Sequence, residues 1–481
     1  MTIRRALSVT AVAEAVAFAA NLITVIIISR LLTPEEIGIF SVAVAVIGLA
    51  HIFRDFGVTQ YVVQADSISN NDLRATFTVA LGISWSIALA LLLVSQPFGQ
   101  FYASNEVGEV LMLLAAVFLV APFGAPIQSL LLRERAFETL AIIGIACTLV
   151  SATVTLVAVV LGESYRSMAW GAIAQHLTRA VLANYYRPGH LFLIPSLAGA
   201  SKILRFGGLS TVATLTNQAG DSGPDLIVGR TLGFSEVAFL SRALGVRRMS
   251  VDNLLRIVAR VHFPHFAQRV RDGEHPANLF CSAAHYTLAI HVPLLAMLAL
   301  LAEPLIIFMF GEQWNRSALI ATIICIGSIL VAPYVLYGNS LTASGHLVQY
   351  VISQLIIQAT KLMTFALSLW LTLEQVIIAL VFAYLFEAII SHYTLRHTYG
   401  PGIQRLFAEV FPTIALTVST LAGPVLVGTA ISFSVASEIS LFIELILMSA
   451  LGVAGWIVGI FVIRHELRHD IKNLARRLVH F

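Results

Sequence analysis

Residues 29–40 have the sequence SRLLTPEEIGIF, in which Arg30 ends an apolar run and a Thr-Pro-Glu-Glu break follows. Thr33 suits the N-cap of a new helix and Glu36 the reciprocal capping position three residues on, with a proline at the first helical position between them. The stretch therefore predicts two apolar helices joined by a tight break. A similar pattern, GRTLGFSEVAFL, occupies residues 229–240, which is 200 positions later.

The composition indicates a membrane protein with many helical spans. The 481 residues are 58% hydrophobic and only 11% charged, whereas soluble domains carry about 25% charged residues. A hydrocarbon core about 30 Å thick requires roughly 20 apolar residues per helix, and such runs follow one another along almost the whole chain. We therefore predict an all-α polytopic membrane protein with no room for a large soluble domain.

Apolar windows separated by loop signals predict about 14 transmembrane helices. The first follows Arg4 and Arg5, and because it is long for a signal peptide and contains Glu14 and Asn21, we expect an uncleaved span. The predicted spans are 7–30, 36–62, 73–95, 108–132, 138–161, 165–187, 203–231, 235–262, 278–308, 317–339, 347–370, 374–396, 407–431 and 438–463.

The repeated pattern predicts two related lobes. Residues 29–46 share six of 18 positions with residues 229–246, and in both copies an Arg precedes the break and a Glu follows it. Six predicted helices separate the copies, so both copies run in the same direction, which predicts a parallel repeat with substrate bound between the lobes. The predicted domains are two six-helix lobes at 1–190 and 191–400, two additional helices at 401–463, and a basic amphipathic cytoplasmic tail at 464–481.

The distribution of the 29 Lys and Arg residues predicts that both termini are cytoplasmic. With that orientation the outer ends hold Arg30, Arg166, Arg230 and Arg316, and the spans hold Arg54, Arg179, Arg242, Arg247, Arg248 and Lys361. The remaining 19 lie inside, as the positive-inside rule requires. The tail places apolar residues at helical spacing among basic ones, which predicts an amphipathic helix on the anionic inner leaflet.

The chain resembles a known family at several motifs. Residues 29–64, SRLLTPEEIGIFSVAVAVIGLAHIFRDFGVTQYVVQ, resemble the N-terminal signature of the bacterial Wzx-type oligosaccharide flippases of the multidrug/oligosaccharidyl-lipid/polysaccharide (MOP) superfamily. ILRFGG (203–208), DLIVGRTLG (225–233) and PLIIFMFGEQW (304–314) resemble its second-half motifs. The resemblance implies an alternating-access transporter, not an enzyme. It implies movement of an undecaprenyl-pyrophosphate-linked oligosaccharide to the outer leaflet of the inner membrane, for O-antigen, capsule or exopolysaccharide synthesis.

Cations inside the membrane are the candidate substrate-binding groups, because a lipid diphosphate headgroup is anionic. An ionisable side chain in a span costs roughly 2.5–3.5 kcal/mol on insertion scales, and arginine pairs with phosphate through two parallel hydrogen bonds. The alternative for each is a salt bridge between helices or snorkelling to the interface. The candidates are Arg30 and Arg230, which occupy matched places in the repeat, Arg54, Arg179, Arg242, and Lys361, which continues a polar stripe from Gln354 and Gln358.

Acidic residues in the spans are the candidate ion-coupling groups: Glu14, Asp221, Asp225 and Glu387. Asp221 and Asp225 flank Ser-Gly-Pro, where a broken helix is predicted to expose carbonyls and carboxylates to a cation. Glu387 lies between Tyr384 and Ser391 on one helix face. The alternative is that these acids neutralise the arginines.

No cofactor or metal is predicted. The three cysteines lie singly in apolar runs, and His262 and His265 lack a supporting carboxylate. No Gly-x-x-x-x-Gly-Lys-Ser/Thr motif occurs, so the energy must come from an ion gradient, the membrane potential or product removal. The expected partners are the membrane and a lipid-linked oligosaccharide, with a polysaccharide polymerase or export machinery as a candidate partner and no nucleic acid.

Three other functions compete with this prediction. A cation-coupled drug or metabolite exporter of the same superfamily would have a cavity dominated by carboxylates rather than by Arg and Lys. A membrane glycan polymerase or ligase usually needs a sizeable outer loop, which the predicted spans do not leave. A murein-precursor flippase is a closer relative, but the match at 29–64 favours the polysaccharide group.

Overall fold

The computed structural model describes residues 3–54, 62, 68–188, 195–196, 208–430 and 438–468. Within these ranges the regular structure is helical and no strand occurs, which confirms the all-α class. Eleven of the described helical segments are long and apolar enough to cross a membrane. The chain is therefore a multi-pass membrane protein, and the total of 14 spans stays a prediction.

Three of the 14 predicted spans are not among the eleven apolar segments, although the structure has helices there. They are the predicted spans 165–187, 203–231 and 235–262. Their sequences are more polar; α10 (Gly208–Thr231), for example, contains Asp221, Asp225 and Arg230. Ionisable residues in spans face protein or water rather than lipid. A hydropathy criterion alone therefore does not detect spans that contain several ionisable residues.

The chain divides into two compact units, residues 1–238 and 239–481. The first unit includes α10, which lies beyond the predicted lobe boundary at residue 190; the lobes themselves stay a prediction. Its helices are α1 (Ile3–Leu31), α2 (Pro34–Arg54), α4 (Asn70–Phe101), α5 (Asn105–Val120), α6 (Ala125–Arg133), α7 (Phe137–Val160), α8 (Ser167–Tyr186) and α10, and α11 (Phe234–Arg247) starts at its end.

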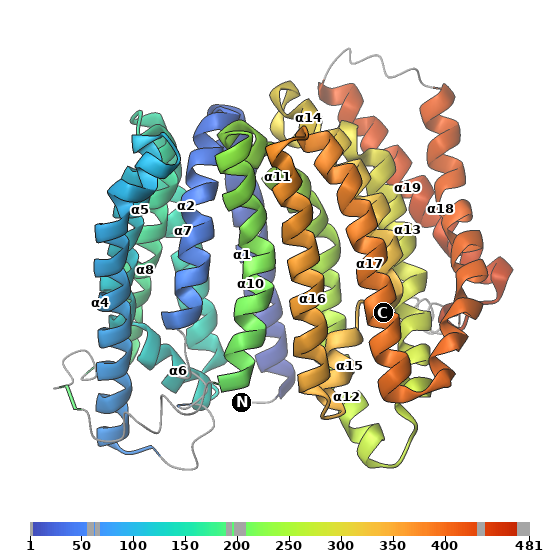
Figure 1. The fold of residues 1–481 in the computed structure, drawn as a ribbon, viewed down its shortest axis with the longest axis horizontal. Coiled ribbons are helices and arrows are strands. Elements are labelled where there is room, and N and C mark those ends of the chain that lie inside the picture. Colours follow the sequence, from blue (N-terminus) through green and yellow to red (C-terminus); the bar gives the residue numbers. More distant parts are fainter. Residues whose placement is uncertain are drawn as a thin grey trace. The chain divides into compact units, whose positions relative to one another are not determined.

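Long helices lie side by side in the first unit (Figure 1). α7 contacts α1 and α8, α5 contacts α4, α8 and α2, and α2 also packs along α10. At one end of this contact, α2 comes very close to the first residue of α11 because residue 38 is a glycine: a Cβ there would lie 1.8 Å from the Phe234 carbonyl oxygen. Small residues let helices in a membrane approach in this way.

The predicted capping box between α1 and α2 is confirmed. Glu36 accepts hydrogen bonds from the Thr33 backbone N–H at 2.7 Å and the Thr33 hydroxyl at 2.8 Å, and the Glu36 N–H donates to Thr33 Oγ1 at 3.3 Å. Ser164 also donates to the Glu36 carboxylate. The break is thereby tied to η2 (Ser164–Arg166), the turn that precedes α8.

The second copy of the pattern has the same local structure with different capping chemistry. α10 ends in a turn that carries Arg230, and α11 begins three residues after its last residue with Glu236 in its first turn. Gly233, which replaces Thr33, has φ +99°, a left-handed conformation that ends α10 and favours glycine. Arg30 in the first copy and Arg230 in the second each lie in the last turn of a helix, where the negative end of the helix dipole stabilises a cation.

Two of the predicted spans, 108–132 and 317–339, each contain a 3₁₀ turn. α5 is separated from α6 by the 3₁₀ turn η1 (Ala121–Phe123), and α14 (Asn315–Val331) from α15 (Tyr337–Ala343) by η5 (Ala332–Tyr334). Each turn follows a valine and contains a proline, in the sequences VAPF at 120–123 and VAPY at 331–334. Proline has no N–H for the helical ladder, so the shared Val-Ala-Pro sequence is followed by a 3₁₀ turn in both units.

The second unit continues from α11 directly through a π-helical turn, η3 (Arg248–Asp252), into α12. Its other elements are α12 (Asn253–Arg271), α13 (Pro276–Phe310), η4 (Glu312–Trp314), α14, η5, α15, α16 (Leu347–Ala366), η6 (Leu367–Leu369), α17 (Leu373–Tyr399), η7 (Pro401–Glu409), α18 (Val410–Ala430) and α19 (Glu438–Ile463).

α13 is the central helix of the second unit. It contacts α14, α18 and α19, while α17 contacts α14 and α16. A buried cluster that includes Phe266, Phe280, Tyr337, Leu341 and Tyr399 joins α12, α13, α15 and α17. This core holds α15 in place beside the polar cavity described below.

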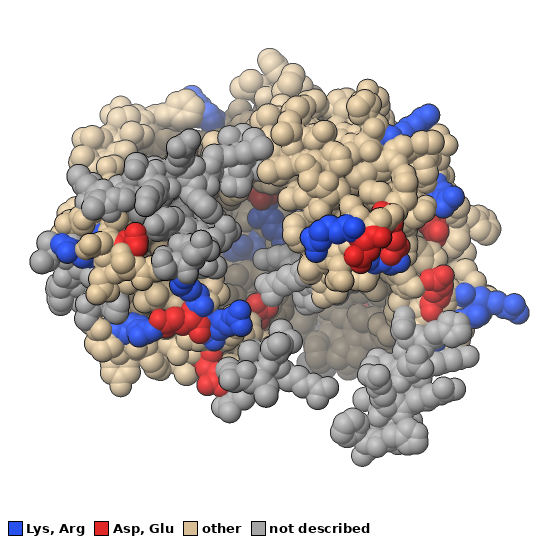
Figure 2. Space-filling model, turned by 90° about the horizontal axis from the view of Figure 1, so that it is seen from below, with Lys and Arg blue, Asp and Glu red and all other residues tan. Residues whose placement is uncertain are grey.

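Charged side chains gather at helix ends. The end of the molecule seen in Figure 2 carries basic and acidic groups within a largely uncharged surface. Described ion pairs at such ends include Arg187 with Glu134 after α6, and Arg269 with Glu274 after α12. The predicted amphipathic tail lies mostly outside the described residues, which stop at Arg468.

Replacing Gly38 by alanine is expected to lower the melting temperature of the purified protein in detergent. The added Cβ would overlap a backbone carbonyl that cannot move aside cheaply, and overpacking of this kind costs about 1–3 kcal/mol. Gly82→Ala on α4 is the matched control, because a Cβ at residue 82 would meet nothing within 4 Å and alanine favours a helix. Equal melting temperatures for Gly38→Ala and the parent protein would contradict the close packing.

Candidate functional site

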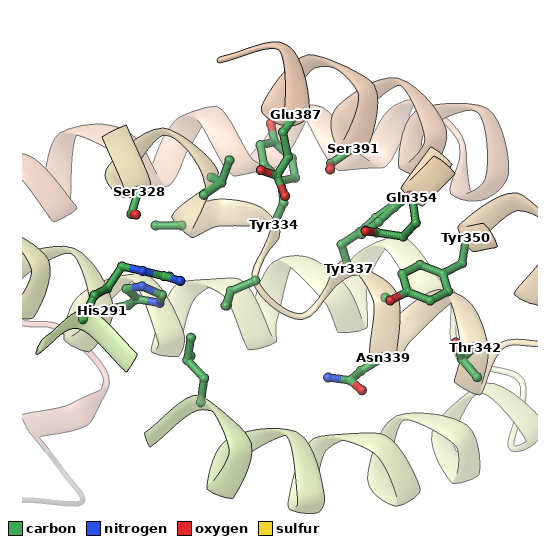
Figure 3. Close-up of a pocket in the computed structure, with 16 residues that line it drawn as sticks. His291, Ser328, Tyr334, Tyr337, Asn339, Thr342, Tyr350, Gln354, Glu387 and Ser391 are labelled. Carbon is green, nitrogen blue, oxygen red and sulfur yellow. The ribbon is translucent and has the colours of Figure 1, made fainter. Parts of the chain in front are cut away.

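A polar cavity of about 350 Å³ lies inside the second unit. Its lining comes from α11, α12, α13, α14, α16 and α17 and from the segment of η5 and α15. Figure 3 shows Tyr337, Asn339, Thr342, Tyr350 and Gln354 around one end of this space, and Ser328 and His291 toward the other. A cavity with this lining is unusual in a bundle of apolar helices and marks the candidate site.

The break between α14 and α15 places much of the lining. Pro333 lies in η5 and the short helix α15 follows, and Tyr334, Tyr337 and Asn339 from this segment all line the cavity. The side chain of Tyr350 fits against this segment because residue 338 is a glycine, where a Cβ would lie 2.6 Å from the Tyr350 ring.

Two tyrosine hydroxyls of the lining are held by the protein. Tyr334 Oη lies 3.2 Å from His392 Nδ1, and the Tyr337 hydroxyl is hydrogen-bonded to Ser353. Tyr337 and Tyr350 pack edge to face with ring centres 5.9 Å apart. These contacts fix the orientation of the rings.

An ion pair lies at the edge of the cavity, between α16 and α17. Lys361 Nζ is 2.7 Å from Glu387 Oε2, and each side chain is only 19% exposed. The ammonium group also lies 5.2 Å from the centre of the Tyr384 ring, a cation–π contact. The structure thus joins Lys361, predicted to bind substrate, to Glu387, predicted to couple an ion.

The two predicted polar stripes meet at this site. On α16, Gln358 donates to Gln354 Oε1 at 3.3 Å, and Gln354 lines the cavity. On α17, Tyr384 and Glu387 contact Lys361, and Ser391 reaches the cavity one turn further on. The i, i+3 and i+4 spacing that suggested these stripes is the spacing of one helix face.

A second cavity, of about 420 Å³, lies in the first unit between α1, α7 and α8. It is mainly apolar and contains two of the predicted residues, Glu14 and Arg179, together with Gln175. The Arg179 Nε is buried and has no hydrogen-bond partner among the described residues. The structure therefore brings a predicted cation and a predicted acid to one cavity.

The other predicted cations lie apart from these cavities. Arg30, Arg54 and Arg230 lie in the last turns of their helices, and the Arg230 guanidinium is 5.1 Å from the Phe101 ring centre. Arg242 lies against two rings, 5.2 Å from Trp314 and 5.7 Å from Phe310.

The predicted helix break at Asp221 and Asp225 was wrong. α10 is one continuous α-helix with Pro224 inside it. Proline is tolerated inside membrane helices when neighbouring groups satisfy the freed carbonyl, so the Gly-Pro pair was a weaker break signal than expected. Asp221 is exposed and Asp225 partly buried on this helix.

Several lining residues were missed from sequence, among them Arg247, His291, Tyr334, Tyr337 and Asn339. The sequence signal that could have pointed to these residues is the Val-Ala-Pro motif, which occurs at 120–122 and 331–333 and marks a turn in each half of the chain. The tyrosines and Asn339 follow the second break. Arg247 lies within a predicted span together with Arg242 and Arg248, and because three arginines on one helix cannot all face one cavity, the sequence alone does not single it out.

An apolar helical bundle with an internal polar cavity and a buried ion pair defines the class: a polytopic membrane protein with a candidate site inside its helices. A family model described as polysaccharide biosynthesis protein matches residues 27–319, more than half of the chain. The chain belongs to this polysaccharide biosynthesis protein family, which confirms the predicted relationship.

Curated relatives agree with the family. The chain is 25% identical over 325 residues to the lipopolysaccharide biosynthesis protein WzxC of Escherichia coli strain K12, which covers 66% of this chain and 65% of that protein. It is 23% identical over 323 residues to the succinoglycan biosynthesis transport protein ExoT of Rhizobium meliloti strain 1021, covering 66% and 64%. The chain thus matches slightly less than two thirds of the length of these relatives.

Solved structures show the same fold at low sequence identity. The lipid II flippase MurJ, in an inward closed conformation, aligns with a TM-score of 0.76 and 11% identity over 96% of this chain and 99% of that one. An inward-facing multidrug resistance MATE family transporter of the MOP superfamily aligns with a TM-score of 0.62 and 15% identity over 82% and 95%.

Removal of one member of the Lys361–Glu387 pair is expected to destabilise the protein more than removal of both. A single substitution leaves a buried charge without its partner, which costs about 3–5 kcal/mol, whereas neutral replacements of similar size are tolerated. Lys361→Met and Glu387→Gln should each lower the melting temperature in detergent, and the double variant should recover most of the loss.

The exposed pair Arg269–Glu274 is the matched control for this comparison of the single and double variants. Arg269→Gln should change the melting temperature little, because exposed ion pairs contribute about 0–1 kcal/mol. Single-variant losses at Lys361 and Glu387 that simply add in the double variant would show that the two side chains are not coupled.

Proposed function

We propose that this protein is a flippase that moves an undecaprenyl-diphosphate-linked oligosaccharide across the inner membrane of a bacterium by alternating access. Membership of the polysaccharide biosynthesis protein family carries the proposal. A polar cavity lined by tyrosines and amides, inside otherwise apolar helices, adds support because a glycan needs such a surface to cross a hydrocarbon layer. The product would serve O-antigen, capsule or exopolysaccharide synthesis.

The proposed direction is from the cytoplasmic to the outer leaflet, with both termini in the cytoplasm. The charge asymmetry of the sequence supports this orientation, since 19 of 29 basic residues fall on the proposed inner side. A polysaccharide polymerase or export machinery would take the product on the outer side. The two predicted six-helix lobes would alternate around the substrate.

Arg30 and Arg230 are proposed to hold the diphosphate or to close the outer gate. Each lies in the C-terminal turn of a helix, just before a matched break. The helix dipole stabilises a cation at this position, and the end of a span places the guanidinium near the membrane surface. Arg54, Arg179, Arg242 and Lys361 complete the proposed substrate-binding set. For Arg242, contact with Phe310 and Trp314 also supports a packing role.

Glu387 is the proposed ion-coupling acid with the best-defined surroundings, because a cation that competes with Lys361 for this carboxylate would release the ion pair. Glu14, Asp221 and Asp225 are further proposed coupling residues. The energy source would be an ion gradient or the membrane potential.

A cation-coupled exporter of drugs or metabolites is the second candidate function. The mainly apolar cavity that contains Glu14 favours it, since an organic cation would suit a carboxylate among apolar groups. Arg179 in the same cavity weakens this alternative through charge repulsion.

Purified protein in liposomes is expected to accelerate the movement of an NBD-labelled, undecaprenyl-diphosphate-linked oligosaccharide between leaflets. Dithionite, which reduces NBD only in the accessible leaflet, should bleach about half of the label in empty liposomes and nearly all of it with protein present. NBD-labelled phosphatidylglycerol is the control for non-specific lipid scrambling. Movement of tetraphenylphosphonium without movement of the lipid-linked glycan would support the exporter instead.

The double variant Arg30→Ala, Arg230→Ala is expected to slow glycolipid movement at least tenfold, since each side chain would contribute a charge-assisted contact of about 1.5–3 kcal/mol. Arg166→Ala is the matched control, because this arginine is also at a predicted outer end but pairs with Glu109 at 2.5 Å. Unchanged movement in the double variant would remove both arginines from the proposed mechanism.

A further inference from the structure

We propose that the segment just after α19 is a pH-sensitive latch, in which a neutral His465 stacks on His285 and is released when it takes up a proton. The latch consists of His285 on α13, Glu409 in η7 and His465, all in the second unit. The segment that it holds begins the predicted basic tail, so the latch would control how the base of that tail is attached. The inference goes beyond the proposed function and does not depend on it.

The end of α19 turns His465 into the protein. Arg464 has φ +60°, a left-handed conformation that is uncommon for a residue with a Cβ and that persists only where surrounding contacts hold it. The His465 N–H donates to the Ile460 carbonyl at 3.1 Å, as in a Schellman turn. The result is that His465 is only 8% exposed, although Arg464 before it and Glu466 after it are exposed.

The buried ring of His465 lies flat against that of His285. The ring centres are 4.0 Å apart and the planes differ by 5°. The His285 ring is itself held by Glu409, whose Oε2 lies 2.5 Å from His285 Nδ1. The Leu467 N–H donates to His465 Nδ1 at 3.2 Å. Since this nitrogen accepts a hydrogen bond, the proton of the neutral His465 ring is on Nε2, and the contacts suit the neutral form.

A second proton on His465 opposes these contacts in two ways. It would occupy the lone pair of Nδ1, so the hydrogen bond from the Leu467 N–H would be lost. It would also place a positive charge face to face with His285, in a buried position where a charged ring loses hydration. The carboxylate of Glu409 is already bonded to His285, so the protonated form of His465 is disfavoured while the latch is closed.

The charges around the latch do not reverse this preference. Burial and the nearby His285 lower the pKa of His465 below its usual range, although Glu409 and Glu466 act in the opposite direction. α18 has no charged residue. The other titratable or charged groups of the surrounding elements are Cys281 and Tyr286 on α13, Arg405 in η7, His392 and Arg396 on α17, and Arg464 and Arg468 beside His465.

The lowered pKa determines the direction of the pH response. A released His465 would have the unperturbed pKa of about 6.5, whereas the closed latch keeps the pKa lower. Above about pH 6.5 the ring is neutral in both states, and the latch has its full stability. Below that pH the released form binds the proton more readily, so the ratio of released to closed protein should rise by up to roughly tenfold per pH unit until the closed form is also protonated. Acid therefore opens the latch.

A distance measurement between two spin labels tests the latch. The labels are placed on Gln404→Cys in η7 and Arg464→Cys after α19, two exposed positions, in a protein without its three native cysteines. Double electron–electron resonance on the purified protein in detergent should show one narrow distance at pH 8. A second, broader population should grow as the pH is lowered from 6.5 to 5. Identical distance distributions at pH 8 and pH 5 would overturn the proposal.

A variant without the titrating ring assigns the response. His465→Phe keeps a flat ring that can stack on His285 but cannot take up a proton, so its broad population at pH 5 should be about tenfold smaller than in the parent. His397→Phe is the matched control, because His397 is an exposed histidine on α17, and this variant should respond as the parent does. A full acid response in His465→Phe would contradict the assignment. His465→Gln, which also lacks a titrating group, serves the same purpose if the phenylalanine variant does not fold.

Discussion

A hydrocarbon layer offers no hydrogen bonds, and this constraint governs both the fold and the site. Every backbone group in a span must find its partner within the protein, so the described spans are helices, and two of them contain a 3₁₀ turn at a proline, Pro122 or Pro333. A charge in the same layer needs a partner or water. Lys361 and Glu387 meet this need through each other.

The polar cavity follows from the same constraint. The segment of η5 and α15 contributes Tyr334, Tyr337 and Asn339 to one space, while α16 and α17 bring their polar stripes to its edge. Ion pair, tyrosine rings and amides together form a surface that water or a polar ligand can occupy.

Local chemistry made part of the structure predictable. The Thr33–Glu36 capping box lies within one turn of chain, and its residues alone determine it. The stripe of Gln354, Gln358 and Lys361 likewise needed only helical spacing. The Lys361–Glu387 contact was not predictable, because both residues were assigned roles separately and no spacing rule links two helices. The expected break at Pro224 failed because the effect of a proline depends on its neighbours in space.

Access of water to the cavity is the central claim, because neither ion coupling nor glycan binding is possible in a dry core. Asn339→Cys, in a protein whose Cys147, Cys281 and Cys325 are replaced by alanine, should react with a membrane-impermeant methanethiosulfonate reagent in liposomes. Leu93→Cys, at an exposed apolar position within a span, should stay unreacted in the same liposomes. Failure of the cysteine at position 339 to react from either side of the membrane would contradict the account.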